Sequence, residues 1–76
     1  MANYKTYRWI VSDPELLGGK LAIRGTRLSV SFLLACLAEG MSTQEIQATY
    51  GPFPEEAIAE ILHLAAEELD HPVAAG

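Results

Sequence analysis

The sequence of 76 residues contains a single cysteine, Cys36, and no lysine or arginine after Arg27. One cysteine excludes a disulfide within the chain, and no group of Cys and His has the spacing of a zinc site. A chain of this length buries only about 60–65% of its unfolded surface, so it generally needs a further source of stability such as a disulfide, a metal or a partner chain. Half of the residues are nevertheless hydrophobic. We therefore expect a partner chain to supply this stability, either in a homodimer, in a complex with another protein, or in both.

Long hydrophobic runs are also missing. No run approaches the roughly 18 apolar residues that a membrane-spanning helix needs, and Met1–Lys5 lacks the apolar segment of a signal peptide. Cys36 lies in the apolar run Phe32–Leu37, where a buried, reduced thiol is expected. These features favour a cytoplasmic protein with no membrane partner.

Side chains able to carry out catalysis or to hold a metal are scarce. There is no plausible nucleophile–base pair, and Asp13 and Glu15 lie two residues apart in a turn rather than as an acid–base dyad. Glu60, His63 and Glu67 share one helical face, which reads more simply as a solvated acidic surface than as a weak metal site. We expect no enzymatic activity, no cofactor and no metal.

Charge is distributed unevenly along the chain. Residues 1–27 carry all five basic residues and two acids, a net charge of +3, whereas residues 28–76 carry eight acids and no basic residue, a net charge of −8. The overall charge of −5 conceals this difference. An asymmetry of this size points to charged interaction partners.

The N-terminal part predicts a short β-ribbon. Tyr7–Val11 is rich in aromatic and β-branched residues, and Leu21–Ile23 is a short apolar run between turn signals, so each predicts a strand. Asp13, followed by a proline, predicts a turn between them. Gly18 and Gly19 predict a second tight turn, because both can adopt a positive φ without a Cβ clash.

The remainder of the chain predicts three helices. Ser29 can cap a helix over residues 30–39, and Ser42–Glu45 matches the capping box of a second, short helix. Pro54 suits the first turn of a last helix that ends near residue 70. The apolar positions expected to face the core are Val30, Leu33, Leu34, Leu37, Ile46, Tyr50, Ile58, Ile61, Leu62, Ala65 and Leu69.

Together these elements predict one mostly α domain over residues 1–76. A β-ribbon and basic arm occupies residues 1–28, a three-helix bundle residues 29–70, and a loose tail residues 71–76. The last two helices with their tight turn fit either an ordinary αα-hairpin or a helix-turn-helix.

Charge argues against insertion of the last helix into the major groove of DNA. Glu55, Glu56 and Glu60 would enter the groove with that helix, and it has no Lys or Arg to neutralise phosphates.

The glycine-rich stretch Gly18–Arg27 holds most of the candidate binding residues. Candidate contacts to an anion or nucleic acid are Lys20, Arg24, Thr26, Arg27 and, in the N-terminal arm, Arg8; Gly18, Gly19 and Gly25 are expected to shape the turns. The stretch is not a phosphate-binding P-loop, because the glycine spacing before Lys20 is wrong and Leu21 replaces the Ser or Thr. The arginines either pair with the acidic helices, within the chain or across a dimer, or contact DNA phosphates or an acidic partner.

A homodimer is expected to form through the N-terminal segment and the first helix. The edge strands of a two-strand ribbon have unpaired backbone groups that can bond to a second copy, and such a ribbon is only marginally stable by itself. The residues predicted to contact a dimer mate or another partner are Trp9, Ile23, Phe32 and Leu64.

Several motifs resemble a known family. They are Asp13–Lys20, Ile23–Arg27, Gly40–Ser42 and Glu45–Ile46. Together they resemble the small bacterial domain-of-unknown-function family 433, which is commonly grouped with VapB-type antitoxins. The resemblance runs roughly from Ile10 to Ala65. The departures are Leu21, where the family usually has proline, and Pro54, where it usually has a Thr or Ser helix cap.

The resemblance implies a homeodomain-like helix-turn-helix fold and a binding function. By this resemblance the protein is expected to be the antitoxin of a bacterial type II toxin–antitoxin system. It would neutralise a PIN-like ribonuclease toxin and, in an additional role, bind operator DNA to regulate its own operon. Two alternatives are a DNA-binding transcriptional regulator without a toxin partner and a simple dimerisation module.

Overall fold

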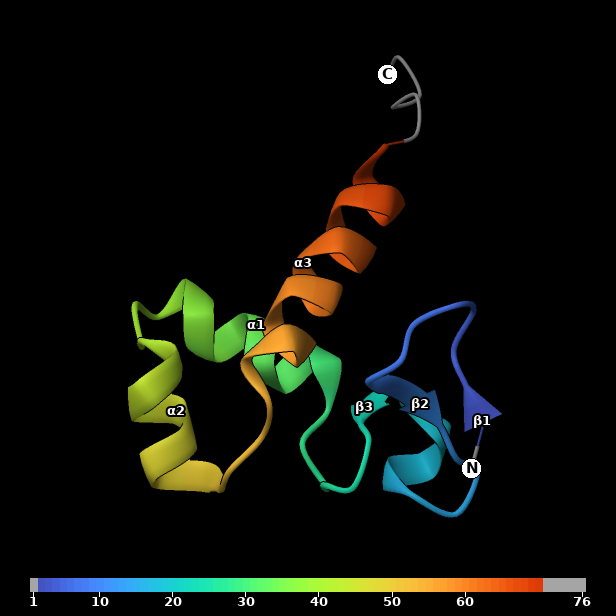
Figure 1. Cartoon of the computed structure of the whole chain (residues 1–76), viewed down its shortest axis with the longest axis horizontal. Coiled ribbons are helices and arrows are strands. Elements are labelled where there is room, and N and C mark those ends of the chain that lie inside the picture. Colours follow the sequence, from blue (N-terminus) through green and yellow to red (C-terminus); the bar gives the residue numbers. More distant parts are fainter. Residues whose placement is uncertain (1, 71–76) are drawn as a thin grey trace.

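A computed structural model describes residues 2–70 of the chain, so the tail expected over residues 71–76 lies outside the described residues. Its elements in chain order are β1 (Ala2–Asn3), β2 (Ile10–Ser12), the 3-10 turn η1 (Leu17–Gly19), β3 (Ala22–Ile23), α1 (Val30–Ala38), α2 (Thr43–Tyr50) and α3 (Glu55–Leu69) (Figure 1). This order confirms the expected mostly α domain with a short N-terminal sheet. Within residues 2–70 no helix is long and apolar enough to cross a membrane.

The sheet is antiparallel and has the strand order β1-β2-β3. Ile10 lies opposite Ile23 and Val11 opposite Ala22, and all four side chains are fully buried. The expected ribbon is therefore present. It gains a third, two-residue strand, β1, that the sequence pattern does not indicate.

The predicted strand over residues 7–11 is wrong at its start, because β2 begins only at Ile10. The backbone N–H groups of Arg8 and Trp9 donate to the carboxylate of Glu60 in α3, at 2.9 and 2.6 Å. Tyr7 N–H donates to the Tyr4 carbonyl and closes a turn. These donors therefore have partners outside the sheet, which keeps the segment out of the strand ladder.

The two predicted turns are confirmed. Leu16 N–H donates to the Asp13 carbonyl at 2.9 Å, and Glu15 N–H donates to Asp13 Oδ1 at 2.9 Å. Gly18 and Gly19 have φ values of 66° and 86°, so this turn uses the left-handed region that glycine favours.

The predicted caps of the first two helices are also confirmed. Ser29 Oγ accepts from Phe32 N–H at 3.0 Å at the start of α1. Ser42 Oγ accepts from Glu45 N–H at 3.1 Å, while Ser42 N–H donates to Glu45 Oε1 at 2.9 Å, which completes the capping box of α2. These hydrogen bonds lower the pKa of Glu45. At α3, Pro54 occupies the cap position without a side-chain hydrogen bond.

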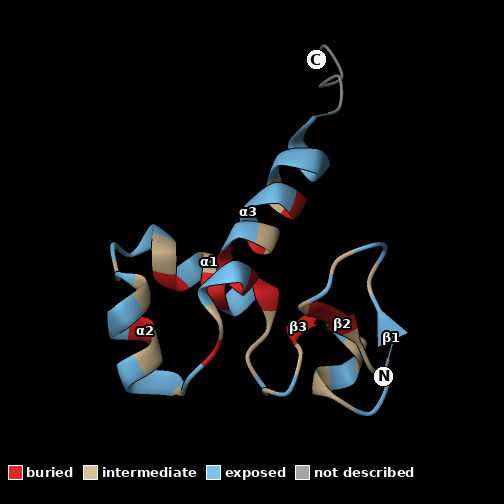
Figure 2. Cartoon of the chain, viewed as in Figure 1, coloured by how far each residue is buried: buried red, intermediate tan, exposed pale blue. Residues whose placement is uncertain are grey.

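The core lies where the sheet meets α1 and α3, with contributions from α2 and the turn before α3 (Figure 2). Its buried residues are Ile10, Ile23, Val30, Leu33, Cys36, Ile46, Phe53, Ala57, Ile58, Ile61 and Leu64. The expectation of a buried Cys36 is confirmed. The turn between α2 and α3 is compatible with both an αα-hairpin and a helix-turn-helix.

Three residues expected in the core are instead exposed. The exposed fractions are 46% for Tyr50, 51% for Leu62 and 81% for Leu69. Tyr50 packs edge-on against Phe32 at the surface, with ring centroids 4.8 Å apart. Leu62 and Leu69 lie beside the buried Ile58 at helical spacing, at the edge of the apolar side of α3 that the core leaves exposed.

Candidate functional site

The N-terminal arm, defined as residues 2–9, is held against α3 by acidic side chains. Glu60 accepts the two backbone hydrogen bonds described above. Glu67, two turns further along, accepts from Tyr7 Oη at 2.7 Å and pairs with Lys5 Nζ at 3.4 Å. Part of the acidic charge of α3 is therefore used inside the chain to position the basic arm.

The contact between Tyr7 and Glu67 changes the pKa of both groups. The hydrogen bond to Glu67, with partial burial, raises the pKa of Tyr7 to about 12. The same hydrogen bond lowers the pKa of Glu67. The bond is therefore strongest when the phenol is protonated and the carboxyl is ionised.

Substitution Tyr7→Phe is expected to remove a pH-dependent contribution to stability. Because the folded-state pKa of Tyr7 is raised from 10.0 to about 12, its contribution is complete below pH 10 and is lost as the pH rises toward 12. Because the pKa of Glu67 is lowered from 4.5, its contribution is present above that pH and is lost on further acidification. Thermal melts should show a constant gap between wild type and variant near neutral pH that closes at both extremes. Tyr50→Phe is the matched control, and a gap that does not vary with pH would contradict the assignment.

Two arginines predicted from sequence lie together beside the arm. Arg24 N–H donates to the Trp9 carbonyl at 2.8 Å, and Arg24 Nε donates to the Arg8 carbonyl at 3.0 Å. The Arg8 guanidinium lies over the Trp9 ring, 5.1 Å from its centroid. We call Arg8 and Arg24 the arginine pair. The hydrogen bond from Arg24 Nε joins this side chain to the backbone of a segment 16 residues away.

The structure does not show the expected pairing of arginines with the acidic helices within the chain. Between residues 2 and 70, the ion pairs join Lys5 to Glu67 and Glu68, at 3.4 and 3.9 Å. Lys5 therefore makes the contact that was expected of the arginines. The arginine pair keeps its charge available for an anionic partner.

Thr26 has a structural role in the loop between β3 and α1. Its hydroxyl donates to the Ile23 carbonyl at 2.9 Å and accepts from Leu28 N–H at 3.0 Å. Gly25 has φ 78° and so shapes the loop as expected. The hydrogen bonds of Thr26 close the loop, and its expected contact with nucleic acid stays a prediction.

The two other candidate basic residues are Arg27 and Lys20. Arg27 and its loop line an open hollow of about 360 Å³ opposite Tyr50, Gly51 and Pro52. Lys20 precedes β3, whereas Arg24 follows it. Among the predicted basic contacts, the structure joins Arg8 and Arg24 by a hydrogen bond.

The residues predicted to contact a partner fall into two groups. Trp9 is partly buried and Phe32 is 38% exposed, so both present surface. Ile23 and Leu64 are 0% and 5% exposed because they belong to the core of the chain itself. Their side chains stabilise the monomer and are not presented to a partner, which corrects that part of the prediction.

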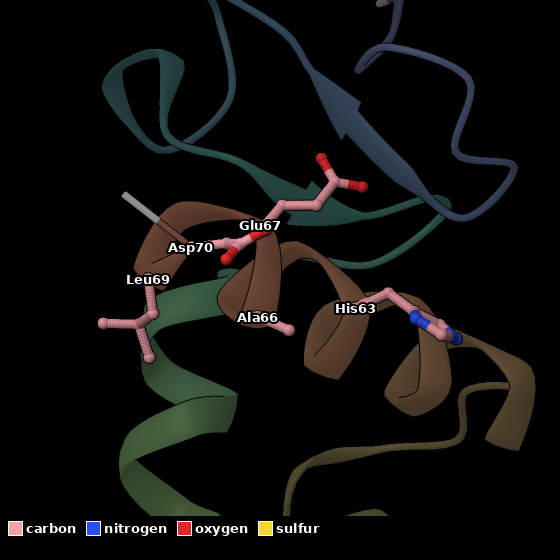
Figure 3. Close-up of a pocket in the computed structure, with 5 residues that line it drawn as sticks. All are labelled: His63, Ala66, Glu67, Leu69 and Asp70. Atoms are coloured by element: carbon pink, nitrogen blue, oxygen red, sulfur yellow. The ribbon is translucent and has the colours of Figure 1, made fainter. Parts of the chain in front are cut away.

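The sequence analysis did not identify an exposed apolar surface on α3, which we call the outer α3 face. It consists of Ala59, Leu62, Ala66 and Leu69, all exposed. The spacing of three, four and three residues was the available signal, because it places all four on one side of a helix. Figure 3 shows Leu69 and Glu67 projecting to different sides of α3, Glu67 toward the strands. An open hollow of about 450 Å³ borders this face and is lined by His63, Ala66, Glu67, Leu69 and Asp70.

No three His, Cys, Asp or Glu side chains gather to hold a metal ion in the part of the chain that the structure describes. Glu60 and Glu67, which flank His63 in sequence, are engaged by the arm instead. The candidate binding surfaces are therefore the arginine pair, the loop around Arg27 and the outer α3 face.

Comparison with known proteins places the chain in a family. A family model described as "Protein of unknown function (DUF433)" matches residues 10–65. No curated protein and no solved structure matches the chain significantly. The matched residues run from the first residue of β2 into α3 and include the glycine-rich basic stretch and both confirmed helix caps. Since the match covers well over half of the 76 residues, the chain belongs to the DUF433 family.

Proposed function

We propose that this protein is the antitoxin of a bacterial type II toxin–antitoxin system and neutralises a PIN-like ribonuclease toxin. The observation that carries the proposal is the acidic, exposed surface of α3. Glu55, Glu56, Glu68 and Asp70 are exposed on it, and no basic residue follows Arg27 in the sequence. The resemblance to VapB-type antitoxins supports the same function.

The physical reason is electrostatic complementarity. A PIN-like ribonuclease coordinates divalent metal through carboxylates and binds RNA. Because RNA is a polyanion, the cleft that binds it is expected to be positively charged. An acidic helix is attracted to such a cleft, which speeds association and disfavours wrong partners. We further propose that the antitoxin acts in the cytoplasm as a homodimer formed through the N-terminal segment and α1, where the exposed Phe32 offers apolar surface.

The test begins with the gene beside the one that encodes this protein, which is expected to encode a small PIN-like nuclease. Expression of that nuclease alone should arrest growth, and co-expression of this protein should restore it. Purified protein should inhibit RNA cleavage stoichiometrically. A neighbouring nuclease whose activity is unchanged by an excess of this protein would overturn the proposal.

A second candidate function is sequence-specific DNA binding, either as autoregulation or without a toxin. The arginine pair supports it, because the Arg24 side chain is bonded to the Arg8 backbone and no ion pair of either arginine with a carboxylate is found within residues 2–70. Each phosphate neutralised by such a group contributes to affinity through counterion release. The acidic α3 is unsuited to the major groove for the same reason.

If the protein binds its operon DNA, Arg24→Ala and Arg27→Ala are expected to flatten the salt dependence of binding. Each should reduce the slope of log K against log salt by roughly one unit for every phosphate that the variant no longer neutralises. Glu55→Gln and Glu56→Gln should leave affinity unchanged or raise it. A salt titration with the upstream operon fragment measures both. Loss of specific binding in the glutamine variants, with normal binding by the alanine variants, would show that α3 reads the groove.

A further inference from the structure

The outer α3 face is an exposed apolar stripe that borders the side of α3 packed on the core. Ala57, Ile58, Ile61 and Leu64 bury the core side of α3. The outer face adds Leu62 and Leu69, which remain 51% and 81% exposed. Single exposed leucines are ordinary, but a contiguous apolar stripe on a soluble domain marks an interaction site. Nothing in residues 2–70 covers this stripe.

The spacing of the stripe specifies the shape of what can bind it. Ala59, Leu62, Ala66 and Leu69 alternate small and large side chains at intervals of three and four residues. This is the seam pattern of paired helices, in which the large residues insert as knobs and the small ones leave holes for the knobs of the partner. The stripe is about 15 Å long, because ten residues separate its ends at about 1.5 Å each. It therefore matches about three turns of a second helix.

The charges beside the stripe indicate the chemistry of that helix. Glu55 precedes it by one turn, and Glu56 and Asp70 lie along one side of it at helical spacing. A second copy of α3 would place its own carboxylates beside these carboxylates, and the like charges would repel each other. An anionic membrane is disfavoured for the same reason. The partner that fits is a helix with apolar residues at three- and four-residue spacing, which can pack on the stripe, and with flanking Lys or Arg residues, which can pair with the acidic side chains beside it.

We propose that the outer α3 face binds a basic amphipathic helix of the toxin. This inference rests on the proposed antitoxin function and assigns the surface that carries it. Ala66 and Leu69 lie beyond the residues that match the family model, so family membership does not by itself account for the stripe.

The test compares two double variants that add the same charge to different helices. Leu62→Glu with Leu69→Glu disrupts the stripe, whereas Gln44→Glu with Ala48→Glu adds two carboxylates to exposed positions of α2. The probe is the nuclease encoded by the neighbouring gene, and its binding is measured by calorimetry together with its inhibition. Loss of two buried leucine anchors is expected to weaken binding at least about 100-fold. The α2 variant should bind within about threefold of wild type.

The outcomes separate the inference from the proposed function. If wild type binds the nuclease and the α3 variant binds equally well, the inference falls and the antitoxin function stands; if wild type does not bind, both fall. If the α3 variant lowers the mass of the protein alone in light scattering, a second copy occupies the stripe and the inference is overturned. Leu62→Ala with Leu69→Ala, expected to weaken binding about tenfold, keeps the test decisive if the glutamates impair folding.

Discussion

Substitution Ile61→Ala is expected to lower the free energy of unfolding by about 2–5 kcal/mol, whereas Leu62→Ala should cost less than about 1 kcal/mol. The two residues are adjacent in α3 and lose side chains of similar size. Ile61 is fully buried, so its truncation leaves a cavity in the core. Leu62 is 51% exposed and lies on the outer α3 face, where water fills the space and alanine improves helix propensity.

Urea denaturation followed by circular dichroism measures both changes. A domain of this size has a total stability of roughly 4–11 kcal/mol, so Ile61→Ala removes a large fraction and leaves part of the population unfolded at 37 °C. Leu62→Ala serves as the matched control within the same helix. Equal losses at the two positions would show that Leu62 is buried in solution, and would contradict its exposure on the outer α3 face.

Substitution Glu60→Ala is expected to cost about 1–3 kcal/mol, the largest effect predicted for an acidic residue in this chain. The Glu60 carboxylate accepts the backbone N–H groups of Arg8 and Trp9 at 2.9 and 2.6 Å. Truncation leaves both donors without that acceptor. Glu60→Gln should have an intermediate effect, because its amide oxygen can still accept while its NH₂ group opposes the second donor.

The control for this prediction is Glu56→Ala, an exposed acid one turn earlier in α3. Thermal melts should show a fall of roughly 4–8 °C per kcal/mol for the Glu60 variant, and little change for the control. Amide hydrogen exchange at Arg8 and Trp9 should accelerate in the Glu60 variant alone. Equal melting temperatures with unchanged exchange would show that Glu60 does not hold the arm in solution.

The Glu60 contact also links the two proposed binding surfaces. It joins α3 to the backbone of Arg8 and Trp9, and the Arg8 and Trp9 carbonyls in turn hold Arg24. A helix with an unfavourable charge for DNA therefore positions the residues best suited to contact it.

The sequence alone determined the features that depend on local contacts. The caps at Ser29 and Ser42 and the turn at Asp13 join residues no more than three positions apart. Their geometry is therefore specified by a few neighbouring side chains, wherever the segment lies in the fold. The family motifs and the division of charge were likewise readable directly from the order of residues.

Only the tertiary structure decided which side of α3 meets the core and how the arm is held. Helical periodicity places Leu62 and Leu69 near Ile58 and Ile61, but it does not reveal how much of this broad apolar side the core covers. The bonds from Arg8 and Trp9 to Glu60, and from Tyr7 to Glu67, span 51 to 60 residues. No local pattern encodes such contacts, because they form only once packing brings the arm and α3 together.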